Sequence, residues 1–302
     1  MKVFITGGSG FIGSVITGQL TGNGHRVTIT TRRSDKELNL PDDVSAIQCD
    51  TTERGSWQEK AATHDALINL AGTPIYRRWN AKNRREIVNS RLLTTRNVVE
   101  ALGLDKSKKK HLLSVSGVGY YGYHGDEIIK EDSQPGEGFL ADLAVRWEAA
   151  ALEAERYGAR VLLCRSGQVL GMSGGVLPKL VTVSKLRLGS PWGSGKQWTS
   201  WVHIMDLANS ILFLLKNQNI EGPVNITSPY PIKNEEMMKT LTSVLKAKPL
   251  IPQIPGLFLR LIAGEFATSF LNGQRVIPAK LLDNGFIFKY ETLRDALDEL
   301  LR

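Results

Sequence analysis

Short apolar runs alternate with longer amphipathic stretches along most of the chain. The first run, Val3 to Ile5, predicts a buried strand, and the apolar positions Val15, Ile16 and Leu20 predict the helix that follows it. Strands and helices that alternate in this way are typical of βαβ units, so we expect an α/β fold with a doubly wound parallel sheet. Further strands are predicted at residues 26–31, 44–49, 66–70, 111–115, 160–165 and 224–226, and further helices at 82–102 and 139–157.

The pattern changes in the middle of the chain. Residues 172–200 are rich in glycine and serine, whereas 201–215 resume the strand-then-helix pattern, with Asp206 as the expected N-cap. The last part of the chain has helices of its own, including an amphipathic helix predicted at 254–271 that packs on the body. We therefore expect a Rossmann-type domain at 1–171, to which 201–227 return, and a smaller C-terminal substrate lobe made of 172–200 and 228–302.

Three glycines separate the first predicted strand from its helix. Gly7 permits a tight turn, Gly10 lets a pyrophosphate approach the bare backbone, and Gly13 lets the helix pack closely on the strand. The first helical N–H groups, those of Phe11 and Ile12 included, then face the phosphates together with the positive end of the helix dipole. An isolated glycine triplet can also be an ordinary turn. Its place between a strand and a helix favours a dinucleotide-binding loop.

The end of the second predicted strand indicates which dinucleotide binds. An NAD-binding fold has an acidic residue here to hold the ribose diol, but this chain has Arg32 and a second arginine after two threonines. A guanidinium clamps a 2′-phosphate that a carboxylate would repel, so Arg32 favours NADP(H) as the cofactor. The alternative is a pair of surface arginines without a ligand.

Two other strand ends are expected to contact the cofactor. Asp50, at the end of the third predicted strand, is a candidate partner for the adenine amino group. Leu70, Ala71 and Gly72 follow the fourth predicted strand. Small residues at the carboxyl end of a strand leave room for a ligand, because ligands bind at that edge of open parallel sheets.

Composition argues against several other classes of protein. With 302 residues, of which 42% are hydrophobic and 23% charged, the chain resembles ordinary globular proteins. No apolar run reaches the ~20 residues that a membrane span needs, and no secretion signal precedes the first strand, so we expect a cytoplasmic protein without a membrane partner. Cys49 and Cys164 lie in apolar runs and are expected to be buried thiols. They lack metal-ligand spacing, so no metal site is expected.

The net charge of +8 would suit an anionic partner such as a nucleic acid. Basic residues cluster at 32–33, 77–85 and 106–110, but aromatic residues do not interleave with them as they do on nucleic-acid-binding surfaces. We expect the lysine run at 106–110 to be a solvated surface. The expected partner is therefore a small-molecule substrate between the two lobes and not a nucleic acid, while the oligomeric state stays open.

Several stretches resemble the extended short-chain dehydrogenase/reductase superfamily. These are the glycine loop at 6–13, Asn-Leu-Ala-Gly at 69–72, the Tyr-Tyr-Gly loop at 120–122 and Arg-Ser-Gly-Gln-Val-Leu-Gly at 165–171. The stretches at 200–206, 225–229 and 273–278 are similar to an epimerase-like branch with a C-terminal domain of unknown function, whose members are often called nucleotide-sugar epimerase or cell-division-inhibitor-like. The resemblance spans essentially the whole chain. It implies a Rossmann domain, NADP(H) binding and a pocket between two lobes.

The catalytic pair of that superfamily is missing at the matching positions. Ordinary members use Tyr-x-x-x-Lys on one helix face, where the lysine lowers the pKa of the phenol and holds the ribose. If Glu148 marks the acidic position downstream, Leu140 stands where the tyrosine belongs and Ala144 where the lysine belongs. Neither side chain can transfer a proton, so the usual chemistry does not carry over.

Three hydroxyls remain as candidate catalytic groups. Ser116 follows the fifth predicted strand, where the superfamily places its substrate-orienting hydroxyl, and Tyr120 and Tyr121 follow in the next loop. The alternative is that one tyrosine packs in the core and the other lines a pocket wall. Other polar and aromatic side chains are candidates either for the cleft or for structural contacts: Trp79, Arg91, Arg165, Gln197, Trp201 and His203.

Two functions remain open. The first is an NADP(H)-dependent oxidoreductase or epimerase-like enzyme, which exchanges hydride between the cofactor and a small carbonyl or hydroxyl compound or a nucleotide sugar. Ser116 and a tyrosine would stabilise the developing oxyanion. The second is a binding protein that senses NADP(H) and does not turn over, because the Tyr/Lys pair is missing.

Overall fold

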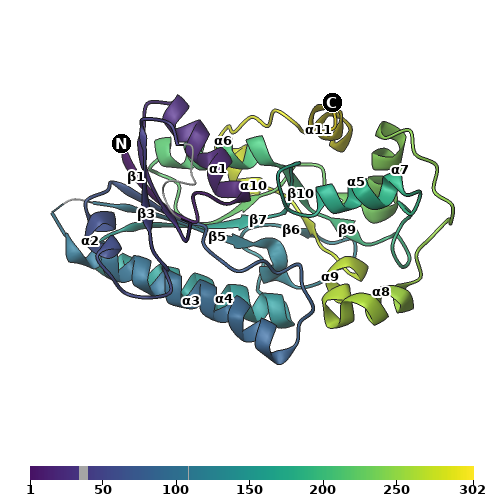
Figure 1. Cartoon of the computed structure of the whole chain (residues 1–302), viewed down its shortest axis with the longest axis horizontal. Coiled ribbons are helices and arrows are strands. Elements are labelled where there is room, and N and C mark those ends of the chain that lie inside the picture. Colours follow the sequence, from purple (N-terminus) through teal and green to yellow (C-terminus); the bar gives the residue numbers. More distant parts are fainter. Residues whose placement is uncertain (34–39, 108) are drawn as a thin grey trace.

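A seven-stranded parallel sheet forms the centre of the protein (Figure 1), in a computed structural model that describes residues 1–33, 40–107 and 109–302. Its strand order is β11-β7-β5-β4-β1-β2-β3, and every neighbouring pair is parallel. The order reverses at β1, which has β2 on one side and β4 on the other. The expected doubly wound α/β fold is thereby confirmed. The strands are β1 (Lys2–Thr6), β2 (Arg26–Thr31), β3 (Val44–Gln48), β4 (Ala66–Asn69), β5 (His111–Gly117), β7 (Arg160–Ser166) and β11 (Gly222–Ile226).

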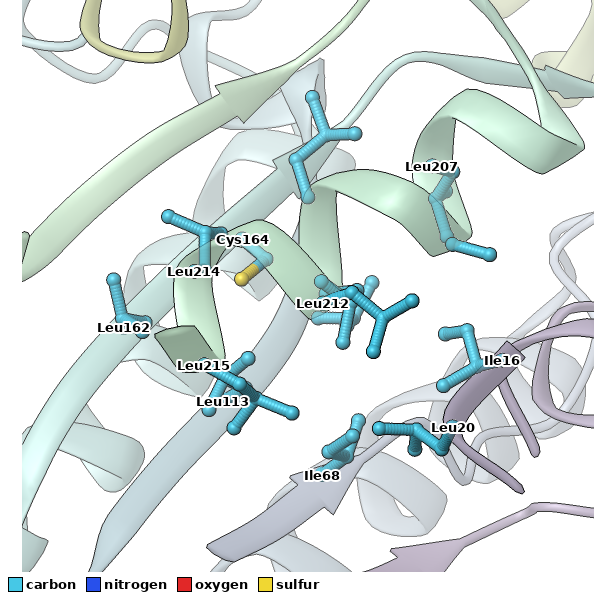
Figure 2. Packing of buried hydrophobic residues seen from close by; sticks show 14 of the residues in the cluster. Ile16, Leu20, Ile68, Leu113, Leu162, Cys164, Leu207, Leu212, Leu214 and Leu215 are labelled. Atoms are coloured by element: carbon cyan, nitrogen blue, oxygen red, sulfur yellow. The ribbon is translucent and has the colours of Figure 1, made fainter. Parts of the chain in front are cut away.

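Alternate side chains of β1 pack on opposite faces of the sheet, because successive residues of a strand point in opposite directions. Val3 and Ile5 lie in the core under α1 (Phe11–Gly22) and α6 (Ile204–Lys216). Phe4 lies in the core under α2 (Trp57–Ala62), α3 (Ala81–Leu104) and α4 (Phe139–Leu152). Figure 2 shows the first of these layers, in which the leucines of α6 cover the strands.

The remaining elements lie around the carboxyl edge of the sheet and in the C-terminal part of the chain (Figure 1). Short strands pair as β8 with β10, β9 with β12 and β6 with β13. These strands are β6 (Ile128–Ile129), β8 (Gln168–Leu170), β9 (Trp198–Thr199), β10 (Trp201–His203), β12 (Ile232–Lys233) and β13 (Arg275–Val276). The helices are α5 (Leu177–Lys185), α7 (Asn234–Val244), α8 (Gly256–Ala263), α9 (Thr268–Leu271), α10 (Ala279–Asp283) and α11 (Leu293–Leu300).

Two helices differ from the sequence prediction. The helix predicted at 139–157 is α4 only to Leu152, and a 3₁₀ turn follows it. The single helix predicted at 254–271 is broken into α8, a 3₁₀ turn and α9, because Gly264 has a φ of 62° that interrupts the helix. The apolar side chains of α8 face outward, with Leu257 72% and Leu261 68% exposed, so the expectation that they pack on the body was wrong.

The structure also corrects the expectation that the lysine run at 106–110 is a solvated surface. Lys110, in the predicted solvated run, is only 3% exposed, and its Nζ atom donates to the carbonyl oxygen of Asp105 at 2.5 Å. Lys108 of the same run lies outside the described residues. Across the part of the chain that the structure describes, none of the helices combines the length and the apolar character that crossing a membrane would require.

Buried polar groups of α6 hold the C-terminal segment against the sheet. The carboxylate of Asp206 accepts hydrogen bonds from the backbone N–H groups of Lys289 and Tyr290, both at 2.9 Å. Phe286 and Phe288, just before them, pack in the same core as α1 and α6. Part of the expected C-terminal lobe thus lies in the core of the sheet domain, and the domain boundary itself stays a prediction.

His203, and not Asp206, caps the N-terminus of α6. Its Nδ1 atom accepts a hydrogen bond from the N–H of Met205 at 3.1 Å. That bond leaves Nε2 to carry the proton and donate to the carboxylate of Glu299 on α11, at 2.9 Å. The histidine therefore links the start of α6 to the end of the chain.

We expect Asp206→Ala to lower the free energy of unfolding by about 2–4 kcal/mol, because two backbone N–H groups lose their acceptor. Urea unfolding followed by circular dichroism measures the change. Asp298→Ala is the matched control, since that carboxylate only pairs with Arg294 at the surface, and it should change stability by less than about 0.5 kcal/mol. Equal losses in the two variants would contradict the anchoring role of Asp206.

Candidate functional site

The glycine loop between β1 and α1 has the shape of a phosphate cradle. Gly7 has a φ of 72°, which a tight turn requires. A Cβ atom on Gly13 would lie 2.2 Å from the carbonyl oxygen of Gly7, so only glycine lets α1 come this close to the strand. At Gly10 a Cβ would meet only that same oxygen, at 3.2 Å, and among the described residues no side chain caps the helix. The N–H groups at the start of α1 are thus available to an anion, and the geometry fits a diphosphate.

Two threonines hold this loop against the neighbouring strands. The Oγ1 atom of Thr30, on β2, accepts a hydrogen bond from the N–H of Gly7 at 3.3 Å. The Oγ1 atom of Thr6 accepts from the N–H groups of Leu70 and Ala71, at 3.2 and 3.3 Å. The ends of β1, β2 and β4 therefore meet around the cradle. Leu70 and Ala71 lie beside it, followed by Gly72, and contact of these residues with the cofactor stays a prediction.

Arg32 and Asp50 lie on the other side of the cradle, after the adjacent strands β2 and β3. Both residues are exposed. The carboxylate of Asp50 accepts hydrogen bonds from the N–H and the hydroxyl of Thr52, at 2.9 and 2.7 Å. These bonds lower the pKa of Asp50, and the nearby Arg32 lowers it further. Among the described residues the guanidinium of Arg32 forms no ion pair, so it could meet a 2′-phosphate; contacts of either residue with the cofactor stay predictions.

Phe11 connects the cradle to the segment after β8. A Cβ atom on Gly171 or Gly174 would lie 2.8 or 2.6 Å from atoms of the Phe11 ring, so both glycines press on that ring. The ring is in turn packed against the core that contains α6. The segment at 171–175 therefore forms a wall next to the start of α1.

Two of the three candidate catalytic hydroxyls lie within a buried hydrogen-bond network. Ser116 is 5% exposed, and its hydroxyl donates to Oε1 of Glu148 at 2.7 Å. Tyr121 is fully buried; its hydroxyl donates to Oδ1 of Asn225 at 2.7 Å and accepts from Nη1 of Arg165 at 2.9 Å. Burial raises the pKa of Tyr121 to about 12, which opposes its ionisation. Both hydroxyls stabilise the protein in this arrangement, and a catalytic role for either stays a prediction.

A buried ion pair between Arg165 and Glu148 is the centre of that network. The guanidinium donates to both carboxylate oxygens, with Nε to Oε1 at 2.9 Å and Nη2 to Oε2 at 2.7 Å. The two side chains are only 4% and 5% exposed. Of the two roles that the sequence left open for Arg165, a structural one is thus supported, because its donors are bonded to Glu148, Tyr121 and the carbonyl of Glu131.

Tyr120 differs from Ser116 and Tyr121. Its side chain is partly exposed, and its ring lies under the guanidinium of Arg165, with 3.4 Å between the guanidinium carbon and the ring centroid. Among the described residues its hydroxyl makes no hydrogen bond. Of the three candidates, Tyr120 therefore has the hydroxyl that is free to meet a substrate.

Apolar side chains occupy the face of α4 on which the superfamily has its catalytic pair. Leu140 packs on Gly119, where a Cβ would lie 3.1 Å from the Cβ of Leu140. Ala144, one turn later, is buried. Beyond Leu140, an aromatic cluster brings together Trp79 and Phe139 with Phe266 of the C-terminal segment. This side of the cleft is a hydrophobic wall and not a proton-transfer site.

Three of the candidate pocket residues are instead buried in the protein. Trp201 is fully buried, and its Nε1 atom donates to the carbonyl of Tyr230. His203 has the capping role described above, and Trp79 is 7% exposed. Gln197 is partly exposed, and its amide nitrogen donates to two backbone carbonyls. An aromatic residue in the sequence therefore does not by itself show whether its side chain is buried in the core or lines a pocket.

Two surface hollows lie outside this edge of the sheet. The larger, of about 560 Å³, lies between α3 and α4 and is lined by residues such as Arg96 and Arg146. The smaller, of about 420 Å³, lies near the start of β1 and β2, with Lys2 and Arg26 in its lining. Neither hollow contains a residue of the glycine cradle.

Comparisons with known proteins agree with this geometry. The fold and the cradle define a Rossmann-like α/β protein. Residues 3–227 match the NAD-dependent epimerase/dehydratase family, and residues 254–300 match a domain of unknown function, DUF1731. The chain belongs to the NAD-dependent epimerase/dehydratase family, which is the short-chain dehydrogenase/reductase type that the sequence resembles.

Similar proteins cover the chain from end to end. The Bacillus subtilis epimerase family protein YfhF is 36% identical over 305 residues, which cover 100% of this chain and 98% of that protein. The human epimerase family protein SDR39U1, crystallised with NADPH, is 32% identical with a TM-score of 0.86, and 99% of each chain is covered. UDP-glucose 4-epimerase from Thermus thermophilus, in complex with NAD, has a TM-score of 0.80, covers 100% of this chain and 98% of its own, and at 19% identity shows the fold alone.

We expect Glu148→Gln to lower the free energy of unfolding by about 3–5 kcal/mol, because the buried Arg165 guanidinium loses its counter-charge. Chemical unfolding monitored by tryptophan fluorescence tests this. Glu153→Gln, at the end of the same helix, is the control; its side chain is 60% exposed and pairs with Arg156, so its loss should stay below about 0.5 kcal/mol. If Glu148→Gln were as stable as the control, the ion pair would not be a major contributor to stability.

Proposed function

We propose that this protein binds NADP(H) across the carboxyl edge of its sheet and transfers hydride between the cofactor and a small carbonyl or hydroxyl compound. The observation that carries the proposal is the uncapped N-terminus of α1 beside Gly7, Gly10 and Gly13. Arg32 beyond β2, where an NAD-binding fold has an acid, supports NADP(H). The crystallisation of the human relative with NADPH supports the same choice.

Each part of the cofactor has a set of residues to hold it. The N–H groups of Phe11, Ile12 and Gly13 would bind the diphosphate, and Arg32 would pair with the 2′-phosphate. The backbone at 70–72 would run beside the nicotinamide half, on the β4 side of the cradle. The bound nicotinamide supplies or accepts hydride at C4.

The protein's own groups have the remaining tasks. The partly exposed phenol of Tyr120, whose ring lies under the Arg165 guanidinium, would supply or accept the substrate proton. The wall at Leu140 and the aromatic cluster exclude water from the neighbouring space. A small carbonyl or hydroxyl compound or a nucleotide sugar is the expected substrate class.

A second function is favoured by a specific observation. Ser116 and Tyr121 are used in a structural network, and the Tyr/Lys pair is absent from α4. A protein that binds NADP(H) and reports its occupancy to a partner needs the cradle but no proton-transfer group. Such a sensor shares the cofactor site with the enzyme and differs from it only in turnover.

Arg32→Glu should weaken NADPH binding by ~1–3 kcal/mol, about 5- to 150-fold, because a charged hydrogen bond to the 2′-phosphate is replaced by repulsion. NADH, which lacks that phosphate, should bind the variant and the wild type alike. Titration calorimetry measures both. Arg26→Glu makes the same charge change at the opposite end of β2, where the residue is also exposed, and should leave NADPH affinity unchanged. Equal weakening in both variants would indicate a general charge effect.

Turnover separates the two functions. The enzyme should oxidise NADPH in the presence of at least one member of a broad carbonyl panel, and Tyr120→Phe should lower kcat at least ~10²-fold. The loss of reduced-nicotinamide absorbance measures the rate. Tyr123→Phe is the control, because this tyrosine of the same loop is 42% exposed and outside the network. Tight NADPH binding without oxidation by any carbonyl compound would favour the sensor.

A further inference from the structure

Arg91, on α3, directs a guanidinium at the loop after β4. Its Nη1 atom donates to the carbonyl oxygens of Thr73 and Ile87, at 2.9 and 3.2 Å. The guanidinium carbon lies 5.2 Å from the centroid of the Trp147 ring on α4. A Cβ atom on Gly72 would lie only 3.0 Å from the same carbon. The cation is therefore held between the backbone at the end of β4 and a tryptophan ring.

This cation has no anionic partner among the described residues. No carboxylate in those ranges forms an ion pair with it, and both of its hydrogen-bond acceptors are neutral carbonyls. Burial lowers the pKa of Arg91 to about 10, and no neighbouring carboxylate counteracts that effect. The buried Arg165 differs in this respect, since it is paired with Glu148. A partly buried cation without a counter-ion is typical of ligand sites.

Arg91 lies on the side of the cradle where the nicotinamide half of the proposed cofactor would bind. Arg32 and Asp50 follow β2 and β3 on one side of the cradle, whereas Gly72 follows β4 on the other. A dinucleotide whose adenine end lies at β2 must place its nicotinamide end near β4 and β5. Trp147 is also three residues after Ala144, where the superfamily has its lysine. Arg91 thus lies against α4, the helix from which that lysine is missing.

We propose that Arg91 makes this site select the reduced cofactor, so that the protein is loaded with NADPH and works as a reductase and not as an epimerase. The proposal rests on the proposed function and adds the direction of the reaction. The oxidised nicotinamide ring carries a positive charge and the reduced ring is neutral. A fixed, uncompensated cation near the ring therefore disfavours NADP⁺ and leaves NADPH unaffected.

The reaction also needs a group that moves the substrate proton. Leu140 and Ala144 on α4 cannot move a proton in either direction, so the preference for reduction rests on Arg91. In the reductive direction, hydride with its electron pair leaves C4 of NADPH and forms a C–H bond at the carbonyl carbon. The π electrons of the carbonyl move to oxygen, which takes a proton from the Tyr120 phenol or from water. The products are an alcohol and NADP⁺, which the cation helps to expel.

The test compares the affinities of both cofactor forms for the full-length protein by titration calorimetry. Wild type should bind NADPH at least ~10-fold more tightly than NADP⁺, which corresponds to a rise of about 30 mV in the potential of the bound couple. Arg91→Met should bring the two affinities within ~3-fold of each other by tightening NADP⁺ relative to NADPH. Arg91→Lys, which keeps the charge, should retain most of the preference. Arg96→Met, exposed on the same helix and facing the hollow between α3 and α4, should behave as wild type.

The possible outcomes separate the inference from the proposed function. Equal affinities in wild type, or an unchanged preference in Arg91→Met, would overturn the role of Arg91 while leaving NADP(H) binding intact. Failure of wild type to bind either form would instead overturn the proposed function. If Arg91→Met does not fold, the wild-type ratio and the Arg91→Lys ratio still decide, because a preference below ~3-fold in wild type contradicts the inference by itself.

Discussion

The N-terminus of α1 is held against the end of β1 by a contact of backbone on backbone. Because a side chain on Gly13 would overlap the carbonyl oxygen of Gly7, this approach is possible only with glycine. The contact puts the first N–H groups of α1 over the strand at which the sheet order reverses. Thr30 and Thr6 then fasten the ends of β2 and β4 to the same loop. The proposed cofactor site depends on this arrangement, since both halves of the dinucleotide would be positioned from it.

Local patterns in the sequence were sufficient to predict the sheet and its cradle. The apolar run at Val3–Ile5, the glycine spacing and the alternation of strands with helices depend on residues close in the chain, and the structure agrees with each. The basic residue after β2 is likewise a local signal. The same kind of pattern failed at 254–271, where one glycine with a left-handed φ divides a continuous apolar stripe into short helices.

The hydroxyls could not be assigned from the sequence for a different reason. Whether Ser116 and Tyr121 are free depends on Glu148 and Asn225, which lie 32 and 104 residues away along the chain. Such partners are brought together only by the packing of α4 and β11 at the edge of the sheet. His203 and Asp206 present the same difficulty, because their partners belong to the last turns of the chain. From the sequence alone, polar side chains with structural partners therefore could not be told apart from candidate catalytic groups.

The absence of the Tyr/Lys pair changes how the charge near the proposed nicotinamide site depends on pH. In the usual site the phenol and the lysine titrate, so the charge near the nicotinamide follows pH. Here Leu140 and Ala144 do not titrate, and the nearby cation is a guanidinium, which stays protonated throughout the neutral range even with its lowered pKa of about 10. The charge of Arg91, on the side proposed for the nicotinamide, is thus a permanent feature of the fold. A permanent charge suits selection between two redox forms of one cofactor, whereas a titrating pair suits proton transfer. The apolar residues Leu140 and Ala144 on α4 and the unpaired Arg91 on α3 are therefore consistent with each other.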